Sequence, residues 1–370
     1  MKYRLVELLQ CPGCRGDLRL SVSETRPVAD ARGACFPCRR YCALNDTTSL
    51  PDQGRCSGCW QKEIVAGTLT CRICEREFGI VQEVPWLFEQ VGDDQGRKLR
   101  DTVGLYSHLW RSVEPERVPS RTHVEHVQEA LGEPVVQGSM GLDVGSGFGL
   151  DTAFMARQHS SVEILSLDIS EGVYRTKHAT AMLPNVHVIR ASVLALPLRP
   201  GMCDFGYSFG VLHHTTDPQR GLQEIVRVLK GNARVILYLY EDHVDNPWKA
   251  VPLKTVTALR KLTTKLQPRL LSALCYLISP FIVLGFSIPA RVLSMLGPTR
   301  FLADRIPFNF GTSLFSVQGD LVDRFGAPVE LRYSREGVIA LLQACGLTEI
   351  GTTRLRTSAG WVARGVTRSQ

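Results

Sequence analysis

Four pairs of cysteines, each with the spacing C-x-x-C, lie within the first 75 residues of the chain. Each pair can present two thiolates to one metal ion, and two pairs complete a tetrahedral zinc site. Four pairs therefore allow two sites, and we favour a nested arrangement. The outer site is Cys11, Cys14, Cys71 and Cys74, and the inner site is Cys35, Cys38, Cys56 and Cys59. Because four thiolates leave zinc no open position for water, we expect structural rather than catalytic metal; disulfide bonds are the alternative.

A glycine-rich turn lies further along the chain, between an expected strand and an expected helix. It contains Gly145, Gly147 and Gly149 and is followed by Leu150. These glycines allow positive φ and close approach of the backbone to a ligand, but the spacing differs from the G-x-G-x-x-G loop that binds a pyrophosphate. Asp168 ends the next expected strand, where a carboxylate can accept hydrogen bonds from both hydroxyls of a ribose. The pattern indicates a ligand that contains adenosine.

Two adjacent histidines, His213 and His214, follow the expected strand 203–208. The carboxyl ends of parallel strands form the edge where ligands bind, so one of these imidazoles can act as a general base on a hydroxyl or an acidic carbon. Alternatively, both histidines cap or pack the helix that begins near Asp217.

Five segments of the chain must position these residues. They are a cysteine-rich module (1–92), a helical linker (93–138), an α/β core (139–240), an inserted helical cap (241–333), and a final helix with two strands (334–370). The final helix is expected from Ser334 to Cys345, with Gly346 as its C-terminal cap. The last strands are then expected at 347–355 and 359–366.

Four motifs follow the glycine turn in a consistent order. They are Leu196-Pro197-Leu198, the strand 203–208, Val211 to His214, and Leu222 to Gly231. Together with the glycine turn they resemble the class I S-adenosylmethionine-dependent methyltransferases, in particular the subfamily that includes quinone-biosynthesis methyltransferases. The resemblance covers roughly residues 135–240 and the C-terminal helix and strands. It implies an α/β fold with a Rossmann-like seven-stranded sheet, and S-adenosylmethionine as the cofactor.

The resemblance also implies roles for individual residues. Gly145, Ser146, Gly147 and Gly149 would form the loop against the methionine and ribose portions of the cofactor, and Asp143 would help to hold its ammonium group through this loop. Asp168 would bind the ribose. Ser192 stands where the family usually has an Asp for the adenine amino group, and Val193 would offer its backbone amide to the ring. Tyr106 in the linker would touch the cofactor's carboxylate.

The outer cysteine pairs carry a second resemblance. Leu8 to Cys14 and Gly67 to Cys74, with Val84 to Leu87, resemble the small zinc-ribbon family that activates tRNA and release-factor methyltransferases. The inner cysteines depart from that family as an insertion, and Cys42 is left unpaired. The resemblance implies a zinc ribbon before the methyltransferase core.

The insertion has an uneven composition. Residues 246–300 contain eight Lys or Arg and no Asp or Glu, and twenty-one uncharged residues run from Leu270 to Ala290. That run is long enough to span a bilayer, but we expect Pro280, Gly285 and Pro289 to interrupt it. A single crossing would also separate the last helix and strands from their sheet. We therefore expect a helical cap with an apolar face and a basic border.

This cap can lie on an anionic membrane surface or cover a long hydrophobic acceptor. A buried lid, a dimer surface, and a nucleic-acid contact through Lys254 to Arg269 stay open as alternatives. Residues 1–92 hold twelve Lys or Arg against eleven Asp or Glu, which gives this module little attraction for a phosphate backbone, so we do not expect nucleic acid as the partner.

These observations predict an S-adenosylmethionine-dependent methyltransferase that acts on a small, hydrophobic or lipid-linked acceptor. No signal-peptide pattern opens the chain, so we expect a cytoplasmic protein, peripheral on the membrane if 246–300 contacts lipid. Two other functions stay open: an RNA base methyltransferase, and a non-catalytic partner that uses the ribbon to activate another methyltransferase.

Overall fold

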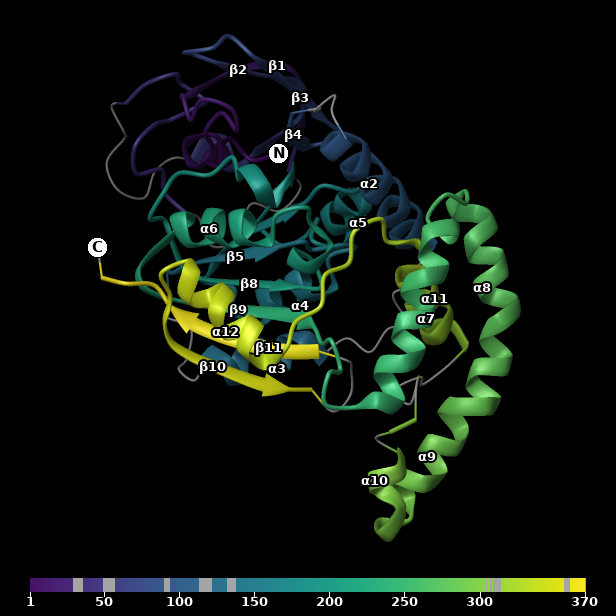
Figure 1. The fold of residues 1–370 in the computed structure, drawn as a ribbon. Helices are drawn as coiled ribbons and strands as arrows, with labels where there is room; N and C mark the ends of the chain where they lie inside the picture. Colours follow the sequence, from purple (N-terminus) through teal and green to yellow (C-terminus); the bar gives the residue numbers. More distant parts are fainter. Residues whose placement is uncertain are drawn as a thin grey trace.

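The computed structural model describes residues 1–28, 36–48, 57–89, 94–112, 122–131, 138–303, 305–306, 308, 314–355 and 360–369. In these residues one eleven-stranded sheet runs through the molecule, helices cover both of its faces, and a long helical insertion projects from one side (Figure 1). Cys35 and Cys56 of the predicted inner zinc site lie outside the described residues.

Seven strands form the Rossmann-like part of the sheet, in the order β7-β6-β5-β8-β9-β11-β10. The parallel strands are β5 (Met140–Val144), β6 (Glu163–Asp168), β7 (Val186–Ala191), β8 (Cys203–Phe209) and β9 (Leu229–Tyr240). β11 (Gly360–Val366) lies antiparallel between β9 and β10 (Thr348–Arg354). The strand order reverses between β5 and β8, and in such sheets the ligand crevice lies at the carboxyl ends of the strands at this point.

Helices bury both faces of this part of the sheet. One face packs against α6 (Pro218–Val228) and α12 (Arg335–Ala344), and the other against α3 (Thr122–Leu131), α4 (Leu150–Gln158) and α5 (Gly172–Ala179). The helix starts follow local sequence signals. The side chain of Asp217 accepts the amide of Arg220 at the start of α6, and Ser334 accepts the amide of Gly337 at the start of α12.

The N-terminal module adds four more strands, so the predicted count of seven is too low for the whole sheet. β1 (Leu18–Pro27), β2 (Lys62–Cys71), β3 (Glu77–Val81) and β4 (Val84–Leu87) form an antiparallel meander. β4 then pairs in parallel with β7, through Trp86 opposite Arg190 and Leu87 opposite Ala191. The buried residues of η1 (Tyr3–Leu8) and the short α1 (Ser57–Trp60) complete the module. Module and core therefore share one sheet and one hydrophobic cluster.

The insertion after β9 is helical. It contains α7 (Pro247–Thr263), α8 (Pro268–Ile282), the π-helical turn η5 (Val283–Ser287), α9 (Ile288–Met295), η6 (Gly297–Thr299), α10 (Arg300–Ala303) and α11 (Leu314–Gly326). α11 packs against α7, α8 and the linker helix α2 (Asp94–Ser112). In Figure 1, α8 and α9 run along the outer side of the molecule, away from the sheet.

One expectation about this insertion is wrong. Pro280, Gly285 and Pro289 do not interrupt the helix, which is continuous for 28 residues from Pro268 to Met295. The π turn directly precedes the first turn of α9, which contains Pro289, and its wider hydrogen-bond spacing accommodates a residue that has no amide hydrogen. By length and composition alone this helix could cross a membrane.

Candidate functional site

A cavity lies at the carboxyl ends of β5 to β8, beneath α2. Four of the eight residues predicted to bind the cofactor line it, and four do not. Those that line it are Gly145, Asp168, Ser192 and Val193. Those outside its lining are Asp143, Ser146, Gly147 and Gly149. The structure thus gathers one residue from the glycine loop, one from the end of β6 and two from the turn after β7.

The glycine loop has the backbone conformation that glycine favours. Gly145, Gly147 and Gly149 have φ values of 85°, 57° and 83°. A Cβ on Gly145 would lie 1.9 Å from a methyl carbon of Val211, and one on Gly149 would lie 2.6 Å from the backbone of Thr176. The loop therefore needs glycine both for its dihedral angles and for its close packing against neighbouring elements.

Asp168 lies half-buried between the glycine loop and the start of α5. Its carboxylate accepts hydrogen bonds from the amide of Gly147 at 2.8 Å and from the amide of Ser170 at 2.7 Å. Burial raises the pKa of Asp168, and these hydrogen bonds oppose the rise. Two carboxylate oxygens offer about four acceptor positions, so capacity remains for two ribose hydroxyls. The residue fits the sugar-binding role that the resemblance implies.

Asp143 lies beneath the loop rather than in the cavity. Its side chain is buried and accepts a hydrogen bond of 2.5 Å from the hydroxyl of Thr152 in α4. Burial raises the pKa of Asp143 to about 7. Any effect on a bound ammonium group must therefore pass through the loop that Asp143 supports.

Ser192 and Val193 form the turn after β7. The hydroxyl of Ser192 accepts the amide of Leu194 at 3.2 Å and so caps the single turn η3 (Val193–Ala195). This hydroxyl keeps a second lone pair, which can accept from a purine amino group. Ile169 and Leu194 also line the cavity and supply apolar surface for a purine ring.

The two predicted catalytic histidines differ in position. His213 is fully buried, does not line the cavity, and stacks on Tyr240 with ring centroids 3.9 Å apart; burial holds its pKa well below the usual range. His214 lines the cavity, and its Nδ1 lies 2.9 Å from the carbonyl oxygen of Val329. Because a carbonyl can only accept, Nδ1 carries the hydrogen, and Nε2 is the atom left to take up a proton. The geometry selects His214 as the candidate base.

A carboxylate from the insertion completes this part of the site. Asp323 in α11 lies 3.6 Å from Nε2 of His214. It also accepts hydrogen bonds from the hydroxyls of Tyr106, at 2.5 Å, and Tyr240, at 2.8 Å. Burial alone would raise the pKa of Asp323, but His214 and the two tyrosines lower it below the usual range. Asp323 is therefore a buried carboxylate that faces an imidazole at the cavity wall.

Sequence patterns did not single out Asp323 or Tyr240. The resemblance implied that Tyr106 touches the cofactor's carboxylate; in the structure Tyr106 lines the cavity and its hydroxyl donates a hydrogen bond to Asp323. The sequence does predict that the charged segment from Asp320 to Tyr333, which closes the insertion, either aims charged side chains at the acceptor or forms a salt-bridged connector. Asp323 faces His214, and other charges of the segment form ion pairs. Asp320 pairs with Arg324, and Glu330 pairs with Arg260 and Arg332.

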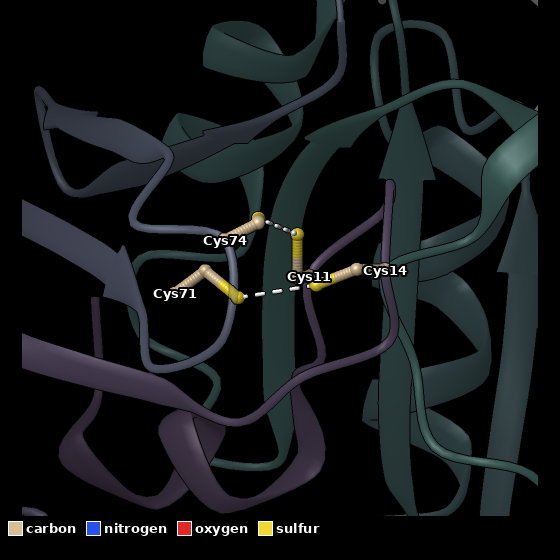
Figure 2. A group of neighbouring side chains, drawn as sticks. All are labelled: Cys11, Cys14, Cys71 and Cys74. Carbon is tan, nitrogen blue, oxygen red and sulfur yellow. Dashed lines mark hydrogen bonds between the residues drawn. The ribbon is translucent and has the colours of Figure 1, made fainter.

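The outer cysteines come together in the N-terminal module, where β2 ends at Cys71. The Sγ atoms of Cys11, Cys14, Cys71 and Cys74 all lie within 4.8 Å of one another (Figure 2). Cys14 and Cys71 are 3.3 Å apart, and Cys11 and Cys74 are 3.7 Å apart. Tetrahedral zinc with bonds of about 2.3 Å to sulfur requires sulfur atoms about 3.8 Å apart. The four thiols fit a structural zinc ion.

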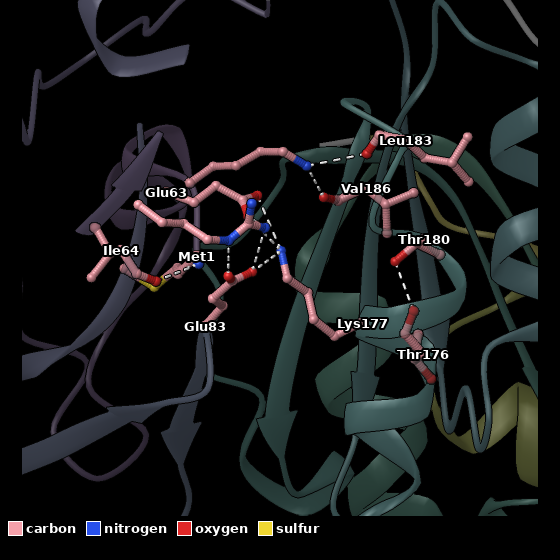
Figure 3. A network of polar contacts seen from close by, with 11 residues as sticks. Met1, Glu63, Ile64, Glu83, Thr176, Lys177, Thr180, Leu183 and Val186 are labelled. Atoms are coloured by element: carbon pink, nitrogen blue, oxygen red, sulfur yellow. Dashed lines mark hydrogen bonds and ion pairs between the residues drawn. The ribbon is translucent and has the colours of Figure 1, made fainter. Parts of the chain in front are cut away.

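Buried charges join the ribbon to the core. Lys177 in α5 lies 3.0 Å from Glu63 in β2 and 2.9 Å from Glu83 at the turn before β4 (Figure 3). Glu63 also pairs with Arg26 at 2.6 Å. These ion pairs sit beside the β4 and β7 pairing, so polar and backbone interactions fix the ribbon against the sheet.

Comparisons with known proteins match the N-terminal module and the α/β core to two separate family models. The family model described as a methyltransferase domain matches residues 142–237, and the model described as Trm112p-like protein matches residues 2–83. The first range begins at β5 and ends within β9, and the second covers the ribbon strands β1 to β3.

Curated relatives match shorter stretches. The demethylmenaquinone methyltransferase of Clavibacter sepedonicus is 31% identical over 104 residues, which is 28% of this chain and 41% of the relative. An uncharacterized protein of Synechococcus sp. is 29% identical over 116 residues, which is 30% of this chain and 27% of the relative. The matched part thus spans less than half the length of either relative.

Among solved structures, the chain is similar to one chain of the complex between the Haloferax volcanii Trm112 methyltransferase activator and a methyltransferase. The TM-score is 0.42 at 14% identity, over 71% of this chain and 97% of the other.

Proposed function

The chain joins a methyltransferase domain to a Trm112p-like domain, and on this basis we propose that the protein transfers a methyl group from S-adenosylmethionine to a small, hydrophobic or lipid-linked acceptor. The observation that carries the proposal is the cavity in which Asp168 and the glycine loop meet His214 and Tyr106. One end of this cavity has the groups that an adenosine needs, and the other has a base supported by a carboxylate.

At the donor end, the protein would position the methyl donor and would not need to activate it. S-adenosylmethionine supplies a methyl group on a sulfonium, which departs as a neutral thioether. Asp168 would hold the ribose, and Ser192 and Val193 would border the adenine. Gly145 would bring its backbone close to the reacting end of the cofactor. Alignment of donor and acceptor in a water-poor cavity provides most of the rate in a displacement of this kind.

At the acceptor end, His214 would remove the proton that the acceptor loses. The acceptor's oxygen or acidic carbon would form the bond to the methyl carbon that the cofactor supplies, the electrons of the carbon–sulfur bond would leave with the sulfur, and the acceptor's proton would pass to Nε2 of His214. Asp323, whose carboxylate lies 3.6 Å from Nε2, would then stabilise the positive imidazolium. The hydroxyls of Tyr106 and Tyr240 hold the carboxylate in this position.

The nature of the acceptor follows from the walls near His214. Apolar side chains predominate in the lining, and among the described residues its titratable side chains are Lys98, Asp168, His214 and Tyr106. The apolar lining includes Leu99, Val103, Trp110, Phe209, Val211 and Val329. A pocket of this composition favours a hydrophobic acceptor with one polar group at the reacting position.

The ribbon would support the methyltransferase domain of its own chain. In the Haloferax volcanii complex, Trm112 is the methyltransferase activator and the methyltransferase is a separate protein. In the present protein the Trm112p-like domain lies in the same polypeptide as a methyltransferase domain, and β4 pairs with β7 of that domain. We propose that it stabilises this core in the way a separate activator would serve a separate enzyme.

Two measurements test the proposal. Isothermal titration should show binding of S-adenosylmethionine, and absence of heat at millimolar cofactor would favour a non-catalytic partner protein. Incubation of the protein with a lipid-containing cell extract and methyl-labelled S-adenosylmethionine, followed by mass spectrometry, should reveal a labelled hydrophobic product. Label found only in RNA would overturn the acceptor class but not the donor.

A further inference from the structure

Exposed apolar side chains are concentrated on the inserted cap. Of the twenty-four exposed large hydrophobic residues in the described part of the chain, nineteen lie between Val244 and Leu302. Scattered apolar residues are normal on protein surfaces, but a contiguous patch of this kind marks an interaction site.

The longest helix, Pro268 to Met295, turns large apolar side chains outward. Eight of them follow one another at intervals of three or four residues, and their exposed fractions range from 41% to 76%. We call these residues the apolar stripe: Leu270, Leu274, Leu277, Phe281, Leu284, Ile288, Val292 and Met295. This spacing places them along one face of the helix.

The opposite, buried face of the same helix carries mainly small side chains. Cys275, Ser279, Ser287 and Ala290 are each at most 3% exposed, and Leu271 is the one large side chain buried to the same extent, while Ile282 and Val283 are partly buried against the same cluster. In a helix of a water-soluble domain the large apolar side chains normally face the core. Here the arrangement is reversed, so the stripe needs an apolar partner outside the chain.

The charges around the stripe indicate what that partner is. No acidic residue occurs between positions 246 and 300, and Lys254, Lys261, Lys265 and Arg269 are exposed on α7, the α7–α8 turn and the start of α8. Arg291 is exposed near the other end of the helix. Basic residues beside an exposed apolar helix face suit the headgroups and acyl chains of an anionic lipid surface.

The topology decides how the helix would meet that surface. The strand β9 precedes the insertion, and β10 and β11 follow it in the same sheet. A single crossing of the bilayer would place these strands on opposite sides, so the helix must lie along the membrane. Its inner face packs against α11, which leaves the stripe as the face available to lipid.

We propose that the apolar stripe docks onto an anionic lipid bilayer, with the helix from Pro268 to Met295 lying in the interfacial plane. α11 packs beneath this helix and carries Asp323, so one short helix connects the docking face with the candidate site. The surface inference does not depend on methyl transfer, because vesicle binding can be measured without cofactor or acceptor.

The test uses the full chain and two kinds of vesicle, phosphatidylcholine alone and phosphatidylcholine with phosphatidylglycerol. We expect co-sedimentation with the mixed vesicles and weaker binding to the neutral ones. Replacing Leu277, Phe281 and Leu284 together by Ser should lower the affinity at least about tenfold, because each side chain loses apolar contact with lipid. The matched control replaces Val22, Val81 and Met182 by Ser, which are exposed on other elements, and should bind as the unmodified protein does.

A second pair of variants tests the charge. Lys261→Ser with Lys265→Ser should weaken binding to the mixed vesicles, whereas Arg19→Ser with Lys62→Ser removes the same charge from the ribbon and should not. The proposal would be overturned if both double variants lost the same affinity for the mixed vesicles, or if the triple replacement left that affinity unchanged. The proposal would also be overturned if the triple replacement converted a dimer to a monomer in light scattering and left vesicle binding intact. Binding of single-stranded RNA, but not of vesicles, by the unmodified protein would overturn it as well.

Discussion

The hydroxyl of Tyr106 in α2 donates a hydrogen bond of 2.5 Å to Asp323 in α11, although 217 residues separate the two in the chain. The linker ahead of the sheet and the insertion behind it therefore meet at the wall of the cavity. His214 faces the same carboxylate, so three separate segments build the acceptor end of the candidate site.

Removing the charge of Asp323 should slow methyl transfer without weakening cofactor binding. We expect Asp323→Asn to lower the rate about 100-fold, because the imidazolium of His214 would lose its counter-charge. The measurement is incorporation of labelled methyl into the extract product, beside titration of S-adenosylmethionine, whose affinity should change less than about twofold. Asp320→Asn, on the same helix but ion-paired with Arg324, serves as the control. Equal rates in the two variants would remove Asp323 from the mechanism.

Asp168→Ala should weaken cofactor binding. Loss of two hydrogen bonds from ribose hydroxyls to a carboxylate corresponds to an increase in Kd of about ten- to a hundredfold. Isothermal titration measures this, and thermal unfolding checks that the fold is intact. Asp204→Ala removes the same side chain from β8 outside the cavity lining, where it pairs with Lys230, and should leave Kd unchanged. Unaltered affinity in Asp168→Ala would contradict the donor site.

Cys71→Ser should remove one equivalent of zinc per chain relative to the unmodified protein. Three thiolates cannot complete the tetrahedral site, and the ribbon loses the metal that joins its two knuckles. Elemental analysis of the purified protein gives the metal content, and the melting temperature should fall with it. Cys345→Ser alters a buried cysteine of the C-terminal segment instead and should keep the full content. Identical metal content in both variants would exclude the outer cysteines as ligands.

Lys177→Met should destabilise the protein by about 3 kcal/mol, because it leaves the buried carboxylate of Glu63 and the partly buried carboxylate of Glu83 with less compensating charge. Urea unfolding gives the free energy of unfolding. Arg72→Met breaks the exposed pair with Asp46 and should cost less than about 1 kcal/mol. A small effect in both variants would mean that the ribbon interface does not depend on this network.

Asp143 should make stability fall with rising pH. Its pKa is about 7 in the folded chain against an ordinary value of 3.8, so between these two values the folded state holds a proton that the unfolded state has lost. Asn cannot titrate. The stability of Asp143→Asn relative to the unmodified protein should therefore increase from about pH 4 to about pH 7, by roughly 4 kcal/mol, and level off above that range. Urea unfolding across this range tests it; parallel curves would show that Asp143 keeps an ordinary pKa.

Short-range patterns were enough to predict the strands, the turn and the helix start around the glycine loop. The glycine turn lies between β5 and α4, and Asp168 ends β6, because a strand, a tight turn and a helix start each have local signals. The cysteine pairs are similarly explicit, and the structure brings the outer four together. For the glycine turn and for the cysteine pairs, residue type and spacing in the sequence were sufficient signals.

Long-range packing decided the rest. Asp323 reaches His214 only because α11 folds back over the sheet, and no periodicity in the insertion encodes that return. The strand β4 has four residues, too few for a recognisable pattern, so its pairing with β7 could not be predicted. Pro280 and Pro289 were read as helix breaks because local rules could not anticipate a π turn between them.

β4 pairs with β7, which would otherwise be the edge strand of the seven-stranded part of the sheet. Because β4 belongs to the same chain, this pairing does not depend on protein concentration. A ribbon supplied by another polypeptide would leave when the two were diluted, whereas a tethered one stays at high local concentration. The ribbon also emerges from the ribosome before β7 does. A newly made β7 thus meets a neighbouring strand that has already been synthesised.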